Sequence, residues 1–290
     1  MDNNSRTMIR DMTEGPVLRK LLLFSLPLML GNLLQTVYAL ADSVIVGQFV
    51  GGPGLSAVAT ASSIVMFVTT FGMGFSTAGQ IVISQMVGAD KRDEIGEVTG
   101  TLFTSLAVIA VVIGGIALAF RAPLLRLLNT PEESYEGALS YLSINACGAL
   151  MTYGYNAVSA ILRGMGDSRW PLVAMLVSSL TNIVLDLVFV IFFNMGVAGV
   201  ALATTIAHFL SGMVPLWRIQ SGAYPVRLYM KNLTHPDKEA AGQIFKLGLP
   251  SSLQNAAMSL GSVVIQSFAN SFGSNFIAAN TIIQNTSGPN

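Results

Sequence analysis

Long stretches without charge dominate this sequence. No Asp, Glu, Lys or Arg occurs in residues 21–41, 43–89, 98–120, 137–162, 170–185, 187–217 and 247–290. A helix that spans a bilayer needs about 20 apolar residues. The stretch 43–89 is long enough for two such helices, with a break at Gly51-Gly52-Pro53-Gly54. The stretch 187–217 has a similar break near Asn194-Met195-Gly196.

These stretches predict an all-α membrane protein. The expected helices cover residues 21–48, 55–86, 97–120, 137–161, 170–193, 197–217 and 246–271, and an eighth begins near 277. The apolar runs show no alternation with a period of two, which favours helices over a β-barrel. The first 20 residues are polar and of mixed charge, so the first helix is expected to be a retained span rather than a cleaved signal peptide.

The composition supports a polytopic membrane protein. The chain has 290 residues, with 15 Lys and Arg against 15 Asp and Glu, and only 10% of its residues are charged. A soluble domain carries about 25% charged residues, and a nucleic-acid-binding domain needs a basic face. A soluble enzyme, a disordered tail and a nucleic-acid binder are therefore excluded. Cys147 is expected to be a packing residue, and His208 and His235 belong to no zinc motif.

The basic residues predict the orientation in the membrane. With alternating loops, 13 of the 15 Lys and Arg fall on one side, and only Arg121 and Arg126 fall on the other. Loops rich in Lys and Arg stay in the cytoplasm. The N-terminus and the long polar segment 218–246 are therefore expected to be cytoplasmic.

A weak internal repeat suggests the domain organisation. The segment Leu23-Phe24-Ser25-Leu26-Pro27 is similar to Leu247-Gly248-Leu249-Pro250 after six helices, which gives both copies the same orientation. Parallel repeats of six helices are typical of transporters. We expect an N-lobe of six helices at 1–220, a cytoplasmic linker at 221–244 and the start of a C-lobe at 245–290.

The second repeat stops within its second helix. Residues 277–290 supply about 21 Å of helix, less than the roughly 30 Å of a bilayer core. This predicts a fragment of a longer protein that lacks most of its C-lobe. The alternative is a natural half-transporter that dimerises.

Two acids are expected inside the bilayer. Asp42 lies in the outer half of the first helix, and Asp186 lies near the middle of the fifth, four residues after Asn182. A charged group at such a depth needs a partner, water or a proton. Together with Thr204 in the sixth helix, these oxygens suit a hard cation such as Na⁺, and the carboxyls could carry protons instead.

Structural roles remain open for these residues. Asp42 could reach the outer surface or join two helices, and Asn182 and Thr204 could form ordinary interhelical hydrogen bonds. His208 is expected to be a packed or interfacial histidine rather than a proton relay. Pro27 and Pro250, early in the first helix of each repeat, predict kinks.

Several segments together resemble the multidrug and toxic compound extrusion (MATE) transporters, within a larger group that includes polysaccharide and lipid flippases. They are Leu26-Pro27, Asp42 to Gly47, Gly72 to Ala89, Ile161 to Asp167 before Pro171, Asn182 to Asp186, and Gly196 to Thr205. The order and spacing of these segments across the chain carry the resemblance. It implies two six-helix lobes around a central cavity, repeated in parallel in a 12-helix fold.

The resemblance also implies a cation or proton site in the N-lobe. A branch of the family uses an aspartate on the first helix, an Asn-x-x-x-Asp pair on the fifth and a threonine on the sixth. These match Asp42, Asn182, Asp186 and Thr204. Weaker matches on the fourth helix are Asn156 and Tyr141, and Pro27 is the expected hinge.

The expected function is a cation-coupled antiporter, driven by Na⁺ or H⁺, that exports cationic amphipathic organic compounds by alternating access. The first alternative is a lipid-linked oligosaccharide flippase of the same superfamily, which predicts basic residues in its cavity. The second is a non-transporting membrane scaffold or remnant fragment, in which both intramembrane acids are dispensable. No nucleophile–base pair or metal cluster suggests an enzyme.

The remaining expectations concern surroundings and ligands. The family resemblance implies a bacterial inner membrane and organic cation substrates. The lipid bilayer and the missing C-lobe residues are the other expected partners, and no nucleic acid and no cofactor besides the coupling ion are expected. Na⁺ is the metal to consider at the Asp42 and Asp186 site.

Overall fold

The computed structural model describes residues 17–91, 94–224, 232–233, 236–272 and 276–277, and these contain helices and connecting turns without a strand. In chain order the elements are α1 Val17–Phe49, α2 Gly51–Gly88, α3 Ile95–Ala119, α4 Arg121–Leu127, α5 Glu132–Cys147, α6 Ala149–Gly164, α7 Arg169–Leu187, the π-helix η3 Val188–Phe192, α8 Gly196–Arg218, the π-helix η4 Ile219–Ala223, and α10 Lys238–Asn270. Five of the described helical segments are long and apolar enough to cross a membrane: Leu21–Phe49, Gly51–Gly88, Ile95–Ala119, Arg169–Phe192 and Gly196–Gly222. The expectation of an all-α, polytopic membrane protein is confirmed.

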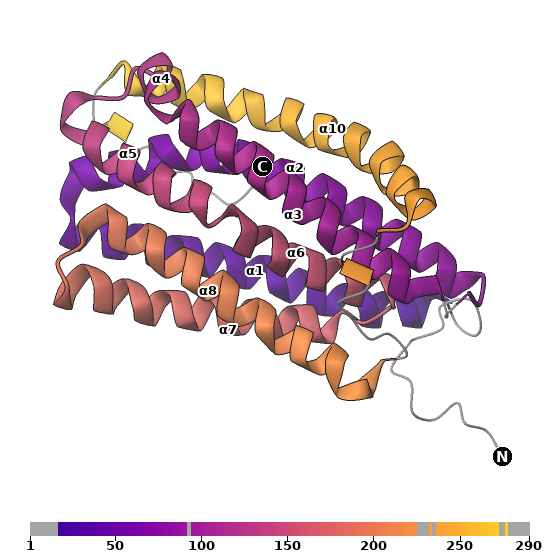
Figure 1. Cartoon of the computed structure of the whole chain (residues 1–290). Coiled ribbons are helices and arrows are strands. Elements are labelled where there is room, and N and C mark those ends of the chain that lie inside the picture. The colour runs from indigo at the N-terminus through magenta and orange to yellow at the C-terminus, as the bar shows by residue number, and fades with distance from the viewer. Residues whose placement is uncertain (1–16, 92–93, 225–231, 234–235, 273–275, 278–290) are drawn as a thin grey trace.

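The long helices lie side by side in one elongated bundle (Figure 1). α10 runs along one side of the bundle against α2, and α7 and α8 form the opposite side. We call the end where α1 begins, at Val17, the proximal end, and the end where α1 finishes, at Phe49, the distal end. The turns from α1 to α2 and from α7 to α8 both lie at the distal end, and the turn from α6 to α7 lies at the proximal end (Figure 1).

The expected fourth span at 137–161 consists of two helices. α5 ends at Cys147, Gly148 follows as a turn, and α6 begins at Ala149. A β-carbon on Gly148 would lie 2.6 Å from the side chain of Thr205, so the interruption falls where α8 approaches most closely. A break set by a neighbouring helix leaves no local signal in the sequence, and the short α4 before α5 was missed as well.

The expected break at residues 51–54 is much tighter than the sequence suggests. α1 ends at Phe49 and α2 begins at Gly51, whose φ of 86° makes the reversal possible without the strain of a side chain. Pro53 lies in the first turn of α2, where no backbone N–H is lost from the helical hydrogen bonds. Pro27 and Pro250 lie inside α1 and α10, and both helices continue through them.

The seventh long helix begins earlier than expected. α10 starts at Lys238 rather than near 246, because Asp237 caps it by accepting a hydrogen bond from the Ala240 N–H at 2.7 Å. The charged residues at its start had been assigned to the linker. The expected eighth helix near 277 lies outside the described residues, apart from residues 276–277.

α2 is the central helix, and its glycines face three different neighbours. A β-carbon on Gly72 would lie 2.7 Å from the Tyr153 ring of α6, and one on Gly79 would lie 2.5 Å from Leu102 Cδ1 of α3. On a third side, a β-carbon on Gly74 would lie 2.5 Å from the Ser252 backbone nitrogen of α10. Small residues allow helices to pack closely in a membrane. The glycine-rich stretch 72–79 is therefore a packing feature and not a ligand-binding loop.

Polar ties hold the distal end together. Asn270, at the end of α10, is 3% exposed, and its Nδ2 donates a hydrogen bond to the Leu128 carbonyl at 2.6 Å. Its Oδ1 accepts from Thr60 Oγ1 of α2 at 3.1 Å and from Gln266 Nε2 at 2.9 Å. The end of α10 is thereby joined to α2 and to the loop after α4.

A second polar tie lies at the proximal end. The Tyr224 hydroxyl donates to Asp167 Oδ2 at 2.6 Å, while Asp167 Oδ1 accepts from the Arg169 backbone N–H at 2.8 Å. Burial, and then the bond to Asp167, raise the pKa of Tyr224, so its hydroxyl stays protonated and remains a donor. Arg218 lies over the Trp170 ring at 5.4 Å. The end of η4 is thus attached to the start of α7.

We expect Gly74→Ala to destabilise the bundle, because its new methyl group would overlap the backbone of Ser252. Overpacking of this kind costs about 1–3 kcal/mol. Gly115→Ala in α3 is the matched control, since no atom lies within 4 Å of a β-carbon there. Thermal unfolding of the detergent-purified protein should show a lower melting temperature for the first variant alone. Equal melting temperatures would contradict the close α2–α10 contact.

Candidate functional site

Three helices bring four polar side chains together in the distal half of the bundle. α1 supplies Asp42, α7 supplies Asn182 and Asp186, and α8 supplies Thr204. The carboxyl groups of Asp42 and Asp186 lie in side-chain contact with each other. The fold therefore brings these four residues, which come from three helices, to one point.

Asn182 bridges the acid and the threonine. In the amide orientation that satisfies its neighbours, Nδ2 donates to Asp186 Oδ2 at 2.9 Å, and Oδ1 accepts from Thr204 Oγ1 at 3.2 Å. Thr204 Oγ1 also lies 3.1 Å from the Val200 carbonyl of its own helix. Asn182 and Asp186 are four residues apart on α7 and therefore share one face.

Asp186 is closed off from solvent, and the acid pair is incompletely bonded. Asp186 is 0% exposed and Asn182 is 1% exposed, while Asp42 is half-buried. One carboxyl oxygen of each acid, Oδ1, makes no hydrogen bond within the described residues. Buried polar atoms without partners cost free energy. Two adjacent carboxylates also repel, so the pair is stabilised by binding a proton or a cation.

Two tyrosines line the acid pair. Tyr141 of α5 is 7% exposed and faces both carboxyls, and its side chain lies in polar contact with Ser62 and Asn145. Tyr38 of α1 faces the same carboxyls and lies in polar contact with Thr204. Tyr141 was expected here. Tyr38 was missed as a site residue, although its position four residues before Asp42 on the same helix places both on one face.

Two expected residues lie away from the acid pair. Gly148, at the break between α5 and α6, lies against Thr205, and Asn156 follows eight residues later on α6. At about 1.5 Å per residue, Asn156 lies about 12 Å closer to the proximal end than this contact. Pro27 lies fifteen residues before Asp42 on α1, in its proximal half.

The end of α7 has an unusual geometry beside the site. The α-helix ends at Leu187, directly after Asp186, and continues as the π-helix η3. π-turns are rare and occur often at functional sites. Asp186 therefore lies in the distal third of the helical segment Arg169–Phe192 rather than near its middle. Nothing in the local sequence signals this change of helix type.

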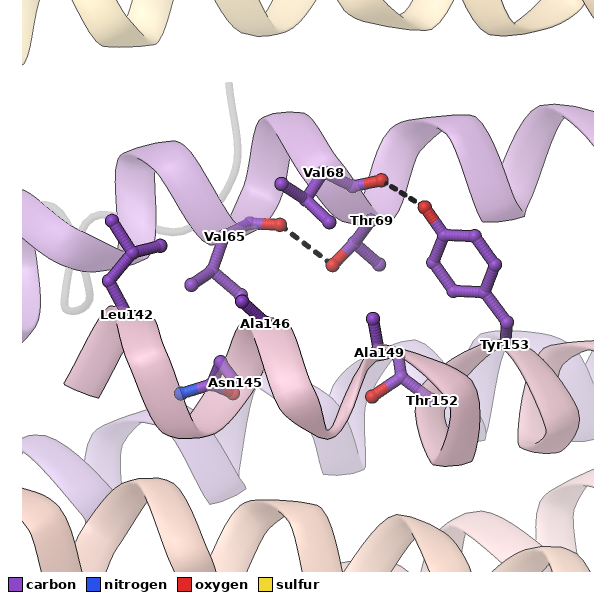
Figure 2. Close-up of a pocket in the computed structure, with 9 residues that line it drawn as sticks. All are labelled: Val65, Val68, Thr69, Leu142, Asn145, Ala146, Ala149, Thr152 and Tyr153. Atoms are coloured by element: carbon purple, nitrogen blue, oxygen red, sulfur yellow. Dashed lines mark hydrogen bonds between the residues drawn. The ribbon is translucent and has the colours of Figure 1, made fainter. Parts of the chain in front are cut away.

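A small pocket with a mixed polar and apolar lining lies between the acid pair and the proximal end. It is lined by Asn145, Thr152, Tyr153, Val68, Thr69 and four apolar side chains, with a volume of about 10 Å³. This is room for about one water molecule. Tyr153 closes one side by donating from its hydroxyl to the Val68 carbonyl at 2.5 Å (Figure 2).

The arrangement is suited to binding a small hard cation or a proton. Carboxyl, amide and hydroxyl oxygens converge at one point, and these are the ligands that hard cations prefer. No group of three or more His, Cys, Asp or Glu that could hold a metal ion occurs among the described residues. Membrane-length helices around two buried acids are typical of an ion-coupled membrane transporter.

Comparison with known proteins identifies the family. The MatE family model matches residues 27–188, more than half of the chain, and the chain belongs to the MatE family. The probable multidrug resistance protein YpnP of Bacillus subtilis (strain 168) is 34% identical over 277 residues, which are 94% of this chain and 61% of YpnP. The family consists of transporters and not of enzymes.

Solved structures show the same fold. The MATE multidrug transporter DinF-BH in complex with R6G matches with a TM-score of 0.88 and 27% identity, covering 97% of this chain and 63% of that one. An inward-facing MATE transporter of the MOP superfamily matches with a TM-score of 0.78 and 27% identity, covering 85% of this chain and 56% of that one. The chain thus spans about 60% of the length of YpnP and DinF-BH.

We expect Asp186→Asn to fold and to melt no lower than the parent protein at pH 7. The substitution keeps the shape and removes one of two carboxylates in contact, whose Oδ1 has no hydrogen-bond partner within the described residues. Asp186→Leu should melt lower, because it leaves the Asn182 amide without its acceptor, at a cost of about 1–3 kcal/mol. Melting curves of the purified proteins in detergent test this. A lower melting temperature for Asp186→Asn would mean that the charge itself stabilises the bundle.

Proposed function

We propose that the protein containing this chain exports cationic, amphipathic organic compounds across a bacterial inner membrane, coupled to inward movement of H⁺ or Na⁺. The observation that carries the proposal is the contact between the Asp42 and Asp186 carboxyls inside a bundle of apolar helices. Burying two acids among apolar helices costs free energy, and ionisable residues within spans therefore usually mark a functional site. The names of the relatives, multidrug resistance and export proteins, support drug efflux.

The charge distribution supports an orientation with the proximal end in the cytoplasm. The basic residues Arg19, Lys20, Lys91, Arg163 and Arg169 lie at or near that end of the helices, as the positive-inside rule requires. Arg121 and Arg126, by contrast, lie in the first and last turns of α4, at the distal end. In this orientation the acid pair lies in the outer half of the membrane, where it can exchange ions with the outside.

The packing of α1 supports a mechanism. Only 6% of the apolar, membrane-spanning part of Leu21–Phe49 is buried, less than in the other candidate spans, so α1 is held less tightly than they are. Its contacts with the acid site, through Tyr38 and Asp42, join it to α7 and α8. In our proposal a cation that binds the acid pair changes this junction, and α1 repacks around the hinge at Pro27. The cation must bind the outward- and inward-facing states with different affinity.

The flippase alternative has weaker support. Recognition of a lipid-linked phosphate requires basic residues inside the cavity, and residues 21–90 contain no Lys or Arg. The scaffold alternative makes the acid pair dispensable, which conflicts with the cost of burying it. Neither is favoured by an observation of its own.

Neutral variants test the proposal. We expect Asp42→Asn and Asp186→Asn each to lower the rate of drug efflux at least about tenfold. A loss of about 1.4 kcal/mol in the coupling free energy between ion binding and transport already gives a factor of ten. The variants are expressed from the complete gene in cells that lack their own pumps, and efflux of R6G or ethidium is followed by fluorescence. Glu136→Gln, an exposed acid on α5, is the control. Efflux at the parent rate in both Asp variants, at equal expression, would overturn the proposal.

A second measurement identifies the coupling ion. Proteoliposomes containing the full-length protein are given either a pH gradient without Na⁺ or a Na⁺ gradient at equal pH, and R6G transport is recorded. The gradient that drives transport in the parent and fails in Asp186→Asn identifies the ion. Transport driven by neither gradient would contradict coupling at this site.

A further inference from the structure

His208 lies inside the bundle, one helical turn from the acid site. It is on α8, four residues after Thr204, and therefore on the same face of that helix. Its Nδ1 lies 3.1 Å from Thr152 Oγ1 of α6. Its ring stacks on that of Tyr155, with centroids 5.4 Å apart and an angle of 20° between the planes. Both ring contacts come from α6, so the imidazole is held in a fixed orientation.

A continuous series of polar groups leads from the acid pair to this histidine. Tyr141 faces Asp42 and Asp186 and contacts Asn145, and Asn145 and Thr152 line the same small pocket (Figure 2). A water molecule in that pocket would join the two side chains, since a bridging water replaces a direct hydrogen bond at small cost. Thr152 then contacts His208 directly.

The series continues toward the proximal end along one face of α6. Tyr155, Ser159 and Arg163 follow one another at intervals of four residues. Ser159 is 2% exposed, and its side chain lies in polar contact with that of Tyr155. Arg163 donates from Nε to Gln80 Oε1 at 3.0 Å, at the end of the bundle.

We infer that His208 carries protons between the acid pair and the proximal, cytoplasmic end, through Thr152 on one side and the Tyr155–Ser159–Arg163 row on the other. A proton that leaves a carboxylic acid of the pair passes through the pocket and the Thr152 hydroxyl and adds to the neutral imidazole at Nδ1. The imidazolium then releases its other proton from Nε2 toward the proximal end, which leaves the neutral Nδ1–H tautomer. Exchange back to the Nε2–H tautomer resets the ring before the next proton arrives. A cation stacked on an aromatic ring is stabilised by it, so Tyr155 favours the charged intermediate.

Other charged and titratable groups lie on α8 itself and on the elements packed against it. Between the acid pair and the proximal end they are Tyr38 and Asp42 on α1, Tyr141 on α5, Tyr153 and Arg163 on α6, Arg169 and Asp186 on α7, and Arg218 on α8, whereas α2, η3 and η4 contribute no Asp, Glu, Lys, Arg, His or Tyr. The two acids lie distal to His208, and the three arginines lie proximal to it. A proton moving inward therefore leaves a site with two carboxyls and moves toward a positively charged end, and His208 lies between them as a group that can take up and release that proton.

The inference rests on the proposed function and on its proton-coupled form. The test uses the full-length protein in proteoliposomes, with R6G transport driven by a pH gradient and its rate recorded against pH. We expect His208→Gln, which can still bond to Thr152 but carries no proton, to transport about tenfold more slowly and to lose the parent pH profile. The dissociation constant of R6G, from fluorescence anisotropy, should change less than about twofold. Thr152→Val, which keeps the shape of the side chain, should slow transport in the same way.

The controls separate the two proposals. Phe209→Leu changes the neighbouring residue of α8, which is 45% exposed, and should behave as the parent. The parent rate and pH profile in His208→Gln or in Thr152→Val would overturn the role of His208. In that case, loss of transport in Asp186→Asn would still support the proposed coupling at the acid pair. Parent activity in Asp186→Asn would instead remove the proposed function. Transport driven by Na⁺ alone and unaffected in His208→Gln would also overturn the inference.

Discussion

Two carboxyl groups in contact inside an apolar bundle are the constraint around which the distal half of the molecule is organised. Asp186 is fully buried, and its contact with Asp42 brings α1 to α7 and α8. The amide of Asn182 and the hydroxyl of Thr204 complete the surroundings but leave one oxygen of each acid without a partner among the described residues. Because protein groups alone do not satisfy this arrangement, a bound proton or cation would stabilise it, and the coupled transport proposed above requires such a dependence.

The two sides of the bundle differ in how firmly they are packed. α2 contacts α3, α5, α6 and α10. At Gly72, Gly74 and Gly79 the neighbouring helices approach so closely that a β-carbon on α2 would overlap them. α1, in contrast, is largely exposed and is attached at its distal half through polar groups. A tightly packed framework beside a loosely held helix allows one element to change position while the rest keeps its shape. The polar tie between Asp167 and Tyr224 belongs to the framework side, since it joins α7 to the end of η4.

Much of the fold could be predicted from the sequence, because a stretch without charge has few alternatives in a bilayer. Asp42, Asn182, Asp186 and Thr204 were found because intramembrane acids are rare and because an interval of four residues places side chains on one face of a helix. What could not be predicted depends on contacts between helices. The break at Gly148 follows from the approach of Thr205, and the π-helix after Asp186 has no signal in the residues that form it. Tyr38 and Asn145 were missed for a different reason, since polar residues near a site gain meaning only once their neighbours are known.

The close contact between Gly74 and Ser252 also bears on how the protein is assembled during synthesis. α2 leaves the ribosome long before α10, so the surface of α2 around Gly74 first faces lipid chains, which fill it poorly. When α10 arrives, it displaces that lipid and adds hydrogen bonds at its own end, where Asn270 accepts from the Thr60 hydroxyl and donates to the Leu128 carbonyl. The helices before α10 are therefore an unfinished unit, and α10 completes the packing of α2, the second helix to be made.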